Sequence, residues 1–271
     1  QVRAVTLEGS RTNPNAPKDL FQDYDISFHV TDMQSFIRDP GWVDRFGARI
    51  IMQMPEAMAM FPPDIGNRFS YMMLFTDGNR IDLTLIPIEE KDTYRNEDKL
   101  MMVLLDKDNA FPDVQPPTDE NYWAKRPSAA FFADCCNEFW WVSTYVAKGL
   151  WRKEILFAID HLNQYMRPML MKMLEWKVGT ETDYAVSIGK NGKYLERYVP
   201  ADRWTELLAT FPNGSYADTW RALFAMGDLF RATAIEVAER LEFAYPVEDD
   251  RRVTAYLKQV HVLPPDAVEF R

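Results

Sequence analysis

Two aspartates one residue apart open an apolar run, and a Gly-Ser pair closes the run before it. The aspartates are Asp23 and Asp25 in DYDISFHV, and the pair is Gly9 and Ser10 in TLEGSR. Because a strand projects residues i and i+2 from one face, we expect the two carboxylates to lie side by side. Such carboxylates repel each other unless a proton or cation relieves them, which suits Mg²⁺ bound together with substrate phosphates.

A phosphate site and a third carboxylate complete the pattern. A turn at Gly9 and Ser10 can bring backbone N–H groups and a hydroxyl close to a phosphate, because glycine permits the approach. Asp82 is the one acid in the apolar run of residues 80–86. Three acids on two neighbouring strands can hold one or two metal ions around a nucleoside triphosphate. We therefore expect Asp23, Asp25 and Asp82 to converge on one face of a sheet.

Short strands separated by helices are indicated over the first hundred residues. The strand-like runs are residues 2–7, 24–30, 48–54, 69–75 and 80–86. The run at 24–30 alternates apolar and polar side chains, which is typical of a half-buried strand. Asp77-Gly78 between the last two runs indicates a hairpin. Residues 31–46 could form a helix broken at Pro40-Gly41, so this half predicts a mixed sheet with a few helices.

Long helical patterns follow a proline-rich stretch at residues 112–127. Apolar residues recur at spacings of three and four over 155–173 and again over 216–245, which predicts amphipathic helices. Pro168 should kink or split the first helix and Pro246 should stop the second, because proline lacks an N–H donor. The sequence thus predicts an α+β protein, with a mixed-sheet domain at residues 1–120 and a mostly helical domain at residues 121–271.

The composition narrows the class of partner and the compartment. The chain has 41 acidic and 31 basic residues, a formal net charge of −10, which disfavours a nucleic-acid partner. No apolar run approaches the roughly 18 residues of a membrane helix, so we expect no membrane association. Cys135 and Cys136 are adjacent, which disfavours a disulfide and favours the reducing cytoplasm. The chain starts at Gln1 directly before a strand-like run, so we expect that residues precede it.

The order strand, Gly-Ser, Asp-x-Asp, strand, and a later strand with one Asp is typical of the polymerase-beta-like nucleotidyltransferases. Several segments also resemble the aminoglycoside 6-adenylyltransferases, the streptomycin-modifying enzymes. These segments are TLEGSR, the DYDI run, IDLTLIP, CCNEFWWV, KGLWRKEILFAIDHLNQ, WKVG, GKNGKYLERY and VAERLEFAYP. The resemblance extends from about residue 2 to about residue 246. Members usually carry a further helix before this region, and Pro168 departs from the family pattern.

The resemblance implies transfer of AMP from ATP to a streptomycin hydroxyl, the 6-hydroxyl, with release of pyrophosphate. By matching motifs, Gly9 and Ser10 would contact the triphosphate, and Asp23 and Asp25 would bind Mg²⁺. Asp82 would be either a metal ligand or the base that takes the proton from the attacking hydroxyl. The residues suit this chemistry independently, because attack on the α-phosphate needs charge neutralisation, in-line positioning and an activated hydroxyl.

Four residues of the helical half are assigned from weaker signals. Lys190 and Lys193 lie in GKNGK, which is not a P-loop but can reach nucleotide phosphates; an ordinary exposed turn is the alternative. Glu138 and Glu154 lie in family-like runs and could pair with the guanidinium groups of streptomycin. The alternative for these two glutamates is a solvated helix face.

Two other functions stay open from the sequence. One is a nucleotidyltransferase that modifies a protein or another metabolite, as in toxin–antitoxin systems. The other is a catalytically inactive nucleotide-binding or scaffold protein, against which the presence of Ser10, Asp23, Asp25 and Asp82 together argues. The first stays open because the residues that select the acceptor lie in the helical half and cannot be located from the sequence.

Overall fold

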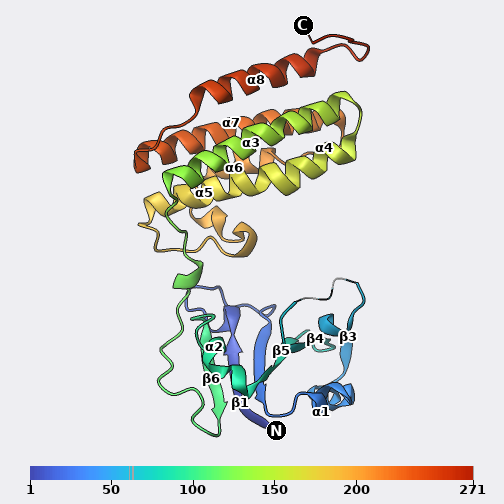
Figure 1. Cartoon of the computed structure of the whole chain (residues 1–271), viewed down its shortest axis with the longest axis vertical. Helices are drawn as coiled ribbons and strands as arrows, with labels where there is room; N and C mark the ends of the chain where they lie inside the picture. The colour runs from blue at the N-terminus through green and yellow to red at the C-terminus, as the bar shows by residue number, and fades with distance from the viewer. Residues whose placement is uncertain (61, 63, 271) are drawn as a thin grey trace. The chain divides into compact units, whose positions relative to one another are not determined.

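The computed structural model describes residues 1–60, 62 and 64–270 of the 271-residue chain. The chain divides into two compact units, Gln1–Asn121 and Tyr122–Arg271. The first unit contains a mixed β-sheet and the second is helical (Figure 1). The predicted α+β fold is therefore confirmed.

In the described part of the first unit, six strands form one sheet in the order β3-β4-β5-β2-β1-β6. The strands are β1 (Val2–Glu8), β2 (Tyr24–Val30), β3 (Arg49–Gln53), β4 (Phe69–Phe75), β5 (Arg80–Pro87) and β6 (Met101–Asp106). Strands β2 and β5 run parallel and the other neighbours run antiparallel. The hairpin predicted around Asp77-Gly78 is confirmed, with Gly78 at a φ of 87° between β4 and β5.

Each face of the sheet carries its own apolar core. On one face, Tyr71, Met73 and Leu83 are buried with side chains from α1 (Gln34–Ile37) and the 3₁₀ helix Pro40–Phe46. The predicted helix over residues 31–46 is thus two short pieces that separate before Pro40. The other face has a smaller core of Ala4, Ile86, Tyr94, Met101, Ala110 and Phe111, to which α2 (Lys91–Tyr94) contributes.

The second unit contains the long helices. They are α3 (Ala129–Trp151), α4 (Ile155–His161), α5 (Arg167–Glu181), α6 (Ala201–Ala209), α7 (Tyr216–Leu241) and α8 (Val247–Val262). Helix α3 begins where the Ser128 side chain accepts a hydrogen bond from the Phe131 N–H, at 3.1 Å. Its face packs on α7 through Phe139 and Phe230, whose parallel rings lie 3.8 Å apart between centroids.

Proline affects the two predicted helices differently. A kink or split was expected near Pro168, and the structure shows an irregular helix there: a π-helical stretch, Leu162–Met166, joins α4 to α5 without a break in the helical backbone. Pro168 follows this stretch by two residues, so its missing N–H falls where the regular hydrogen-bond pattern of the helix is already altered. The stop expected at Pro246 occurs earlier: α7 ends at Leu241, because Glu242 adopts a left-handed φ of 60°.

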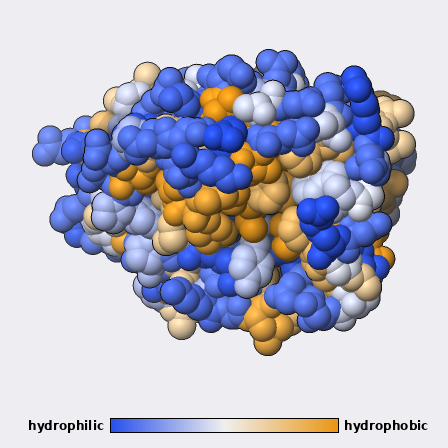
Figure 2. All heavy atoms as spheres, turned by 90° about the horizontal axis from the view of Figure 1, so that it is seen from below, coloured by the Kyte–Doolittle hydropathy of each residue, from blue (hydrophilic) through white to orange (hydrophobic). Residues whose placement is uncertain are grey.

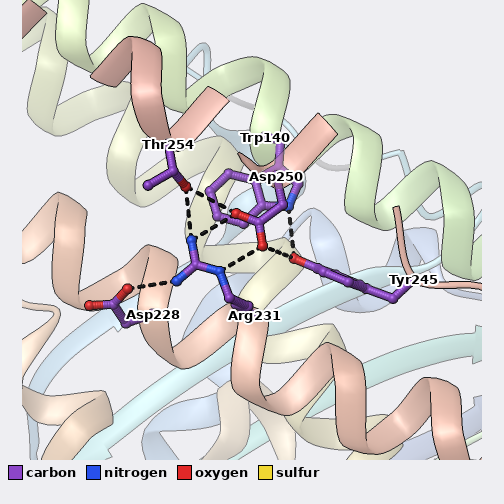
Figure 3. Close-up of polar contacts among 6 residues, drawn as sticks. All are labelled: Trp140, Asp228, Arg231, Tyr245, Asp250 and Thr254. Atoms are coloured by element: carbon purple, nitrogen blue, oxygen red, sulfur yellow. Dashed lines mark hydrogen bonds and ion pairs between the residues drawn. The ribbon is translucent and has the colours of Figure 1, made fainter. Parts of the chain in front are cut away.

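A buried ion pair attaches α8 to α7 (Figure 3). Asp250, which is 5% exposed, accepts hydrogen bonds from Arg231 at 2.6 and 2.7 Å. The hydroxyls of Tyr245 and Thr254 donate to the same carboxylate at 2.8 and 3.0 Å. Asp228 accepts a further hydrogen bond from Arg231, at 2.7 Å. Asp250 is buried and Arg231 is partly buried, with 29% of its side chain exposed, so loss of either partner leaves a charge with little water around it.

Hydrophobic side chains also occur at the surface. Figure 2 shows a patch of them (orange) on the face that it views, surrounded mostly by hydrophilic side chains (blue). The two edge strands of the sheet contribute exposed apolar residues, among them Ile51 on β3 and Leu104 on β6. Within the described residues, no helix combines the length and apolarity needed to cross a membrane.

Candidate active site

Three carboxyl groups lie in one row across three adjacent strands. Asp82 on β5 is paired in parallel register with Asp25 on β2, and Asp25 is paired with Glu8 on β1. Because residues paired across strands share a face of the sheet, all three side chains project from the same face. The expectation that Asp82 and Asp25 share a face is therefore confirmed. We call Asp82, Asp25 and Glu8 the acid row.

Asp23 lies beside the row but outside the strand, since β2 begins at Tyr24. Its backbone is held by Arg11, whose Nε donates to the Asp23 carbonyl at 3.0 Å and whose Nη2 donates to the Gln22 carbonyl at 2.8 Å. The Arg11 guanidinium also lies over the Tyr24 ring, 3.5 Å from its centroid. The segment before β2 is thus fixed by a side chain from the Gly9–Arg11 turn rather than by strand pairing.

Gly9 packs directly against the acid row. It has a φ of 68°, a left-handed conformation that favours glycine, and begins the 3₁₀ turn Gly9–Arg11. A Cβ built at Gly9 would lie 2.2 Å from Oδ2 of Asp25. The next residue, Ser10, accepts a hydrogen bond through its carbonyl from Gln22 Nε2 at 3.1 Å. The conformation and the contact both require glycine, so the turn is held immediately beside the Asp25 carboxylate.

The carboxylates of the site interact electrostatically. Burial, together with the charges of Asp82 and Asp23, raises the pKa of Asp25 to about 6. Arg80 acts in the opposite sense, because it donates two hydrogen bonds to the Asp82 carboxylate and approaches Asp23. The charge of Arg11 also lowers the pKa of Asp25. The three aspartates face two arginines, so the site carries an excess of negative charge.

Glu8 is held by a cluster of polar side chains. The hydroxyl of Tyr94 donates to one Glu8 oxygen, and the Ser27 hydroxyl donates to the other at 3.2 Å. The Thr6 hydroxyl lies 2.9 Å from the Tyr94 hydroxyl and 3.2 Å from Nε2 of His29. Burial raises the pKa of Glu8, and the hydrogen bonds oppose this change. The cluster fixes the strand that leads into the Gly9–Arg11 turn.

The donor set fits a hard divalent cation. Among the residues that the structure describes, no group of three or more His, Cys, Asp and Glu side chains is arranged to hold a metal ion. Mg²⁺, however, is usually held by one or two carboxylates and completes its shell with water and phosphate oxygens. Burial contributes most to the raised pKa of Asp25, and the repulsion from Asp82 and Asp23 that adds to it is the kind that such a cation relieves. The roles of Asp23, Asp25 and Asp82 as metal ligands stay a prediction.

Three residues of this site were not predicted from the sequence. Arg80 is two positions from Asp82 in a strand, so the alternation that placed Asp82 also places Arg80 on the same face. Arg11 and Glu8 flank the Gly-Ser pair, but no sequence pattern indicates what they contact. Only the folded chain shows Arg11 bonded to the segment before β2.

The other predicted residues belong to the second unit. Lys190 and Lys193 are exposed at the 3₁₀ turn Lys190–Gly192, and Lys193 Nζ lies 5.0 Å from the centroid of the Tyr194 ring. Glu138 is exposed on α3, and Glu154 is exposed between α3 and α4. At 1.5 Å per helical residue, Glu138 lies about 20 Å from the end of α3, which Glu154 follows. The structure therefore does not bring the two glutamates together.

Comparisons with known proteins agree on one family. Residues 1–260 match the family described as streptomycin adenylyltransferase. An aminoglycoside 6-adenylyltransferase of Bacillus subtilis (strain 168) is 51% identical over 262 residues, 96% of this chain and 92% of that protein. One of Campylobacter jejuni is 48% identical over 259 residues, 96% of this chain and 90% of that protein.

A solved structure is also similar. The crystal structure of an aminoglycoside 6-adenyltransferase from Bacillus subtilis aligns with a TM-score of 0.52 and 46% identity, covering 97% of this chain and 92% of that one. The family match spans nearly the whole chain and includes both the acid row and the Gly9–Arg11 turn. The chain therefore belongs to the streptomycin adenylyltransferase family, whose members are nucleotidyltransferase enzymes.

Proposed function

We propose that this protein transfers AMP from ATP to the 6-hydroxyl of streptomycin, releasing pyrophosphate and inactivating the antibiotic. The observation that carries the proposal is the contact between Gly9 and Asp25, in register with Asp82. It joins a turn suited to phosphates to carboxylates suited to a metal ion, in a chain of this family. The net charge of −10 favours a cationic acceptor over an anionic one.

Different residues of the first unit, along the acid row and the turn beside it, bind the triphosphate, bind the metal ion and activate the hydroxyl. Gly9 and Ser10 hold the triphosphate, because the turn offers backbone N–H groups and a hydroxyl with no side chain at Gly9 to obstruct them. Asp23 and Asp25 bind Mg²⁺, which when bound neutralises phosphate charge and orients the α-phosphate. Asp82 lies on the far side of Asp25 from the turn, where it either binds metal or takes the proton of the attacking hydroxyl.

The second unit supplies acceptor and nucleotide contacts in this proposal. A glutamate of the α3–α4 region, Glu138 or Glu154, pairs with a guanidinium group of streptomycin, since a carboxylate accepts two parallel N–H bonds from it. Lys190 and Lys193 neutralise nucleotide phosphates. The reaction takes place in the cytoplasm, where ATP is available and the buried thiols of Cys135 and Cys136 stay reduced.

Mass spectrometry after incubation with ATP, Mg²⁺ and a panel of aminoglycosides tests the proposal, with pyrophosphate release measured in parallel. Streptomycin should gain one adenylyl group and kanamycin should not. Kanamycin has compact ammonium groups in place of guanidinium groups, and it does not present a hydroxyl in line with the α-phosphate. Modification of kanamycin but not streptomycin would overturn the acceptor assignment. Labelling of a cellular protein, with no drug modified, would favour the protein-modifying alternative.

A further inference from the structure

Beyond Asp82, the line of paired residues that contains the acid row continues onto β4 and β3 with uncharged side chains. Met72 on β4 is paired with Asp82, and Gln53 on β3 is paired with Met72. One face of the sheet therefore presents, in order, Gln53, Met72, Asp82, Asp25 and Glu8. The Gly9–Arg11 turn directly follows Glu8, so it stands at the β1 end of this order. The β3 and β4 residues stand at the opposite end.

The order of these residues across the sheet indicates from which side of the α-phosphate the attacking hydroxyl approaches and on which side the pyrophosphate leaves. In adenylyl transfer the attacking oxygen and the leaving pyrophosphate lie on opposite sides of the α-phosphate, roughly in line. A triphosphate held at the Gly9–Arg11 turn places its pyrophosphate towards β1, and the acids place its α-phosphate over β2 and β5. The attacking hydroxyl must then approach from the side of β4 and β3.

The sheet surface on that side is open and has the chemistry to receive a sugar. Ile51, Gln53, Met72 and Leu74, which we call the β3–β4 surface, line a shallow depression of about 340 Å³ together with Met73 and Arg80. Ile51 is 65% exposed, and Gln53 is also exposed. The one charged side chain of the depression, Arg80, is already paired with Asp82. Apolar side chains can pack on the C–H faces of sugar rings, and the Gln53 amide can exchange hydrogen bonds with sugar hydroxyls.

We propose that the aminoglycoside acceptor binds on the β3–β4 surface, with Gln53 as a contact residue and Asp82 next to the attacking hydroxyl. The inference rests on the proposed function, because the direction of approach follows from adenylyl transfer. It assigns the surface to the cationic acceptor and excludes the adenosine part of ATP from it.

Opposite charges placed at Gln53 test the assignment. Gln53→Lys should raise the KM for streptomycin about five-fold and Gln53→Glu should lower it by a similar factor, because the acceptor is a polycation a few ångströms away. The KM for ATP should stay unchanged in both variants. Raised ionic strength should reduce both effects. If wild-type enzyme modifies a different aminoglycoside of the panel, that drug replaces streptomycin in the assay.

Leu104→Lys and Leu104→Glu are the matched controls. Leu104 is an exposed residue on β6, the opposite edge strand of the same sheet, so these variants should leave both KM values unchanged. Equal acceptor KM values for the two Gln53 variants would overturn the inference, and so would a lower KM for ATP in Gln53→Lys. A wild-type enzyme that modifies no aminoglycoside would instead overturn the proposed function, and the inference with it. Melting temperatures of the variants verify folding.

Discussion

The Arg80 guanidinium binds the Asp82 carboxylate through two parallel hydrogen bonds, Nε to Oδ1 at 2.9 Å and Nη2 to Oδ2 at 2.7 Å. The same Nε lies 3.6 Å from Oδ2 of Asp23. One side chain therefore neutralises part of the charge of two of the acids and, through its charge, also lowers the pKa of Asp25. Arg80 is the protein's own counter-ion for a site that we expect to bind a divalent cation.

Arg80→Gln should lower the free energy of unfolding by about 1 kcal/mol in EDTA, because the pair is partly exposed and the acids then repel without compensation. Added Mg²⁺ should stabilise this variant more than wild type, since the cation replaces the lost charge. Urea denaturation with and without Mg²⁺ measures both effects. Arg3→Gln is the control, because Arg3 makes a similar two-bond pair with Asp108 away from the acids. Equal Mg²⁺ effects in both variants would contradict this role of Arg80.

Asp25→Asn should be more stable than wild type at pH 8 without metal. Because the folded-state pKa of Asp25 is raised from 3.8 to about 6, its stabilising contribution is complete below about pH 4 and is lost as the pH rises through 6. After solvent screening, the variant should gain roughly 1–2 kcal/mol at pH 8, about a third of that at pH 4.5, and almost nothing at about pH 3. Urea denaturation over this pH range measures the difference. A gain that is independent of pH would show that the buried negative charge of Asp25 is not its cause.

The same Asp25→Asn variant should lose at least about 100-fold in turnover, because a carboxylate that binds the metal ion and orients the phosphate has been neutralised. Turnover near that of wild type would remove Asp25 from the catalytic site.

Gly9→Ala should reduce turnover about 100-fold, because the new Cβ displaces the Asp25 carboxylate. Gly66→Ala is a matched control: Gly66 has a φ of 69°, and nothing lies within 4 Å of a Cβ built there. Both variants should lose about 1 kcal/mol of stability from the left-handed backbone. Only Gly9→Ala should lose activity. A steady-state assay and thermal denaturation separate the two effects, and equal activity in the two variants would contradict the contact.

Asp250→Asn should destabilise the helical unit by about 3 kcal/mol, because Arg231 is then partly buried without its main charge partner (Figure 3). Asp228→Asn removes the other carboxylate bound to the same guanidinium, but the Asp228 side chain is 76% exposed. It should therefore cost no more than about 1 kcal/mol. Chemical denaturation followed by circular dichroism compares them. Similar losses would mean that burial does not distinguish the two pairs.

Glu138→Gln and Glu154→Gln should differ in their effect on streptomycin. Because the two carboxylates are separated by nearly four turns of helix, about 20 Å, one guanidinium group cannot contact both. One variant should raise the KM for streptomycin several-fold with the KM for ATP unchanged, and the other should match wild type. The double variant should equal the more affected single variant. Unchanged KM values in all three would remove both glutamates from the acceptor site.

The sequence by itself determined the local features of this protein. Period-two alternation placed Asp25 on a polar strand face and Asp82 on another, and Asp77-Gly78 specified a hairpin. Recurrence at three and four residues specified the long helices, and the chemistry of proline located the helix irregularity near Pro168. These features depend on residues a few positions apart, whose types alone decide backbone conformation and side-chain direction.

Tertiary structure decided which of these features meet. The register that pairs Asp25 with Asp82 joins strands separated in the chain by β3 and β4, and no local pattern encodes which distant strands pair. No local pattern encodes the contact of Gly9 with Asp25 either, nor the hydrogen bond from Arg11 to the backbone of the segment before β2. Asp23 shows the limit most clearly: the alternation placed it within a strand, but its position depends on an arginine side chain from the preceding turn. Such contacts arise from the packing of the whole sheet, because the free energy that selects them is shared among residues far apart in the chain.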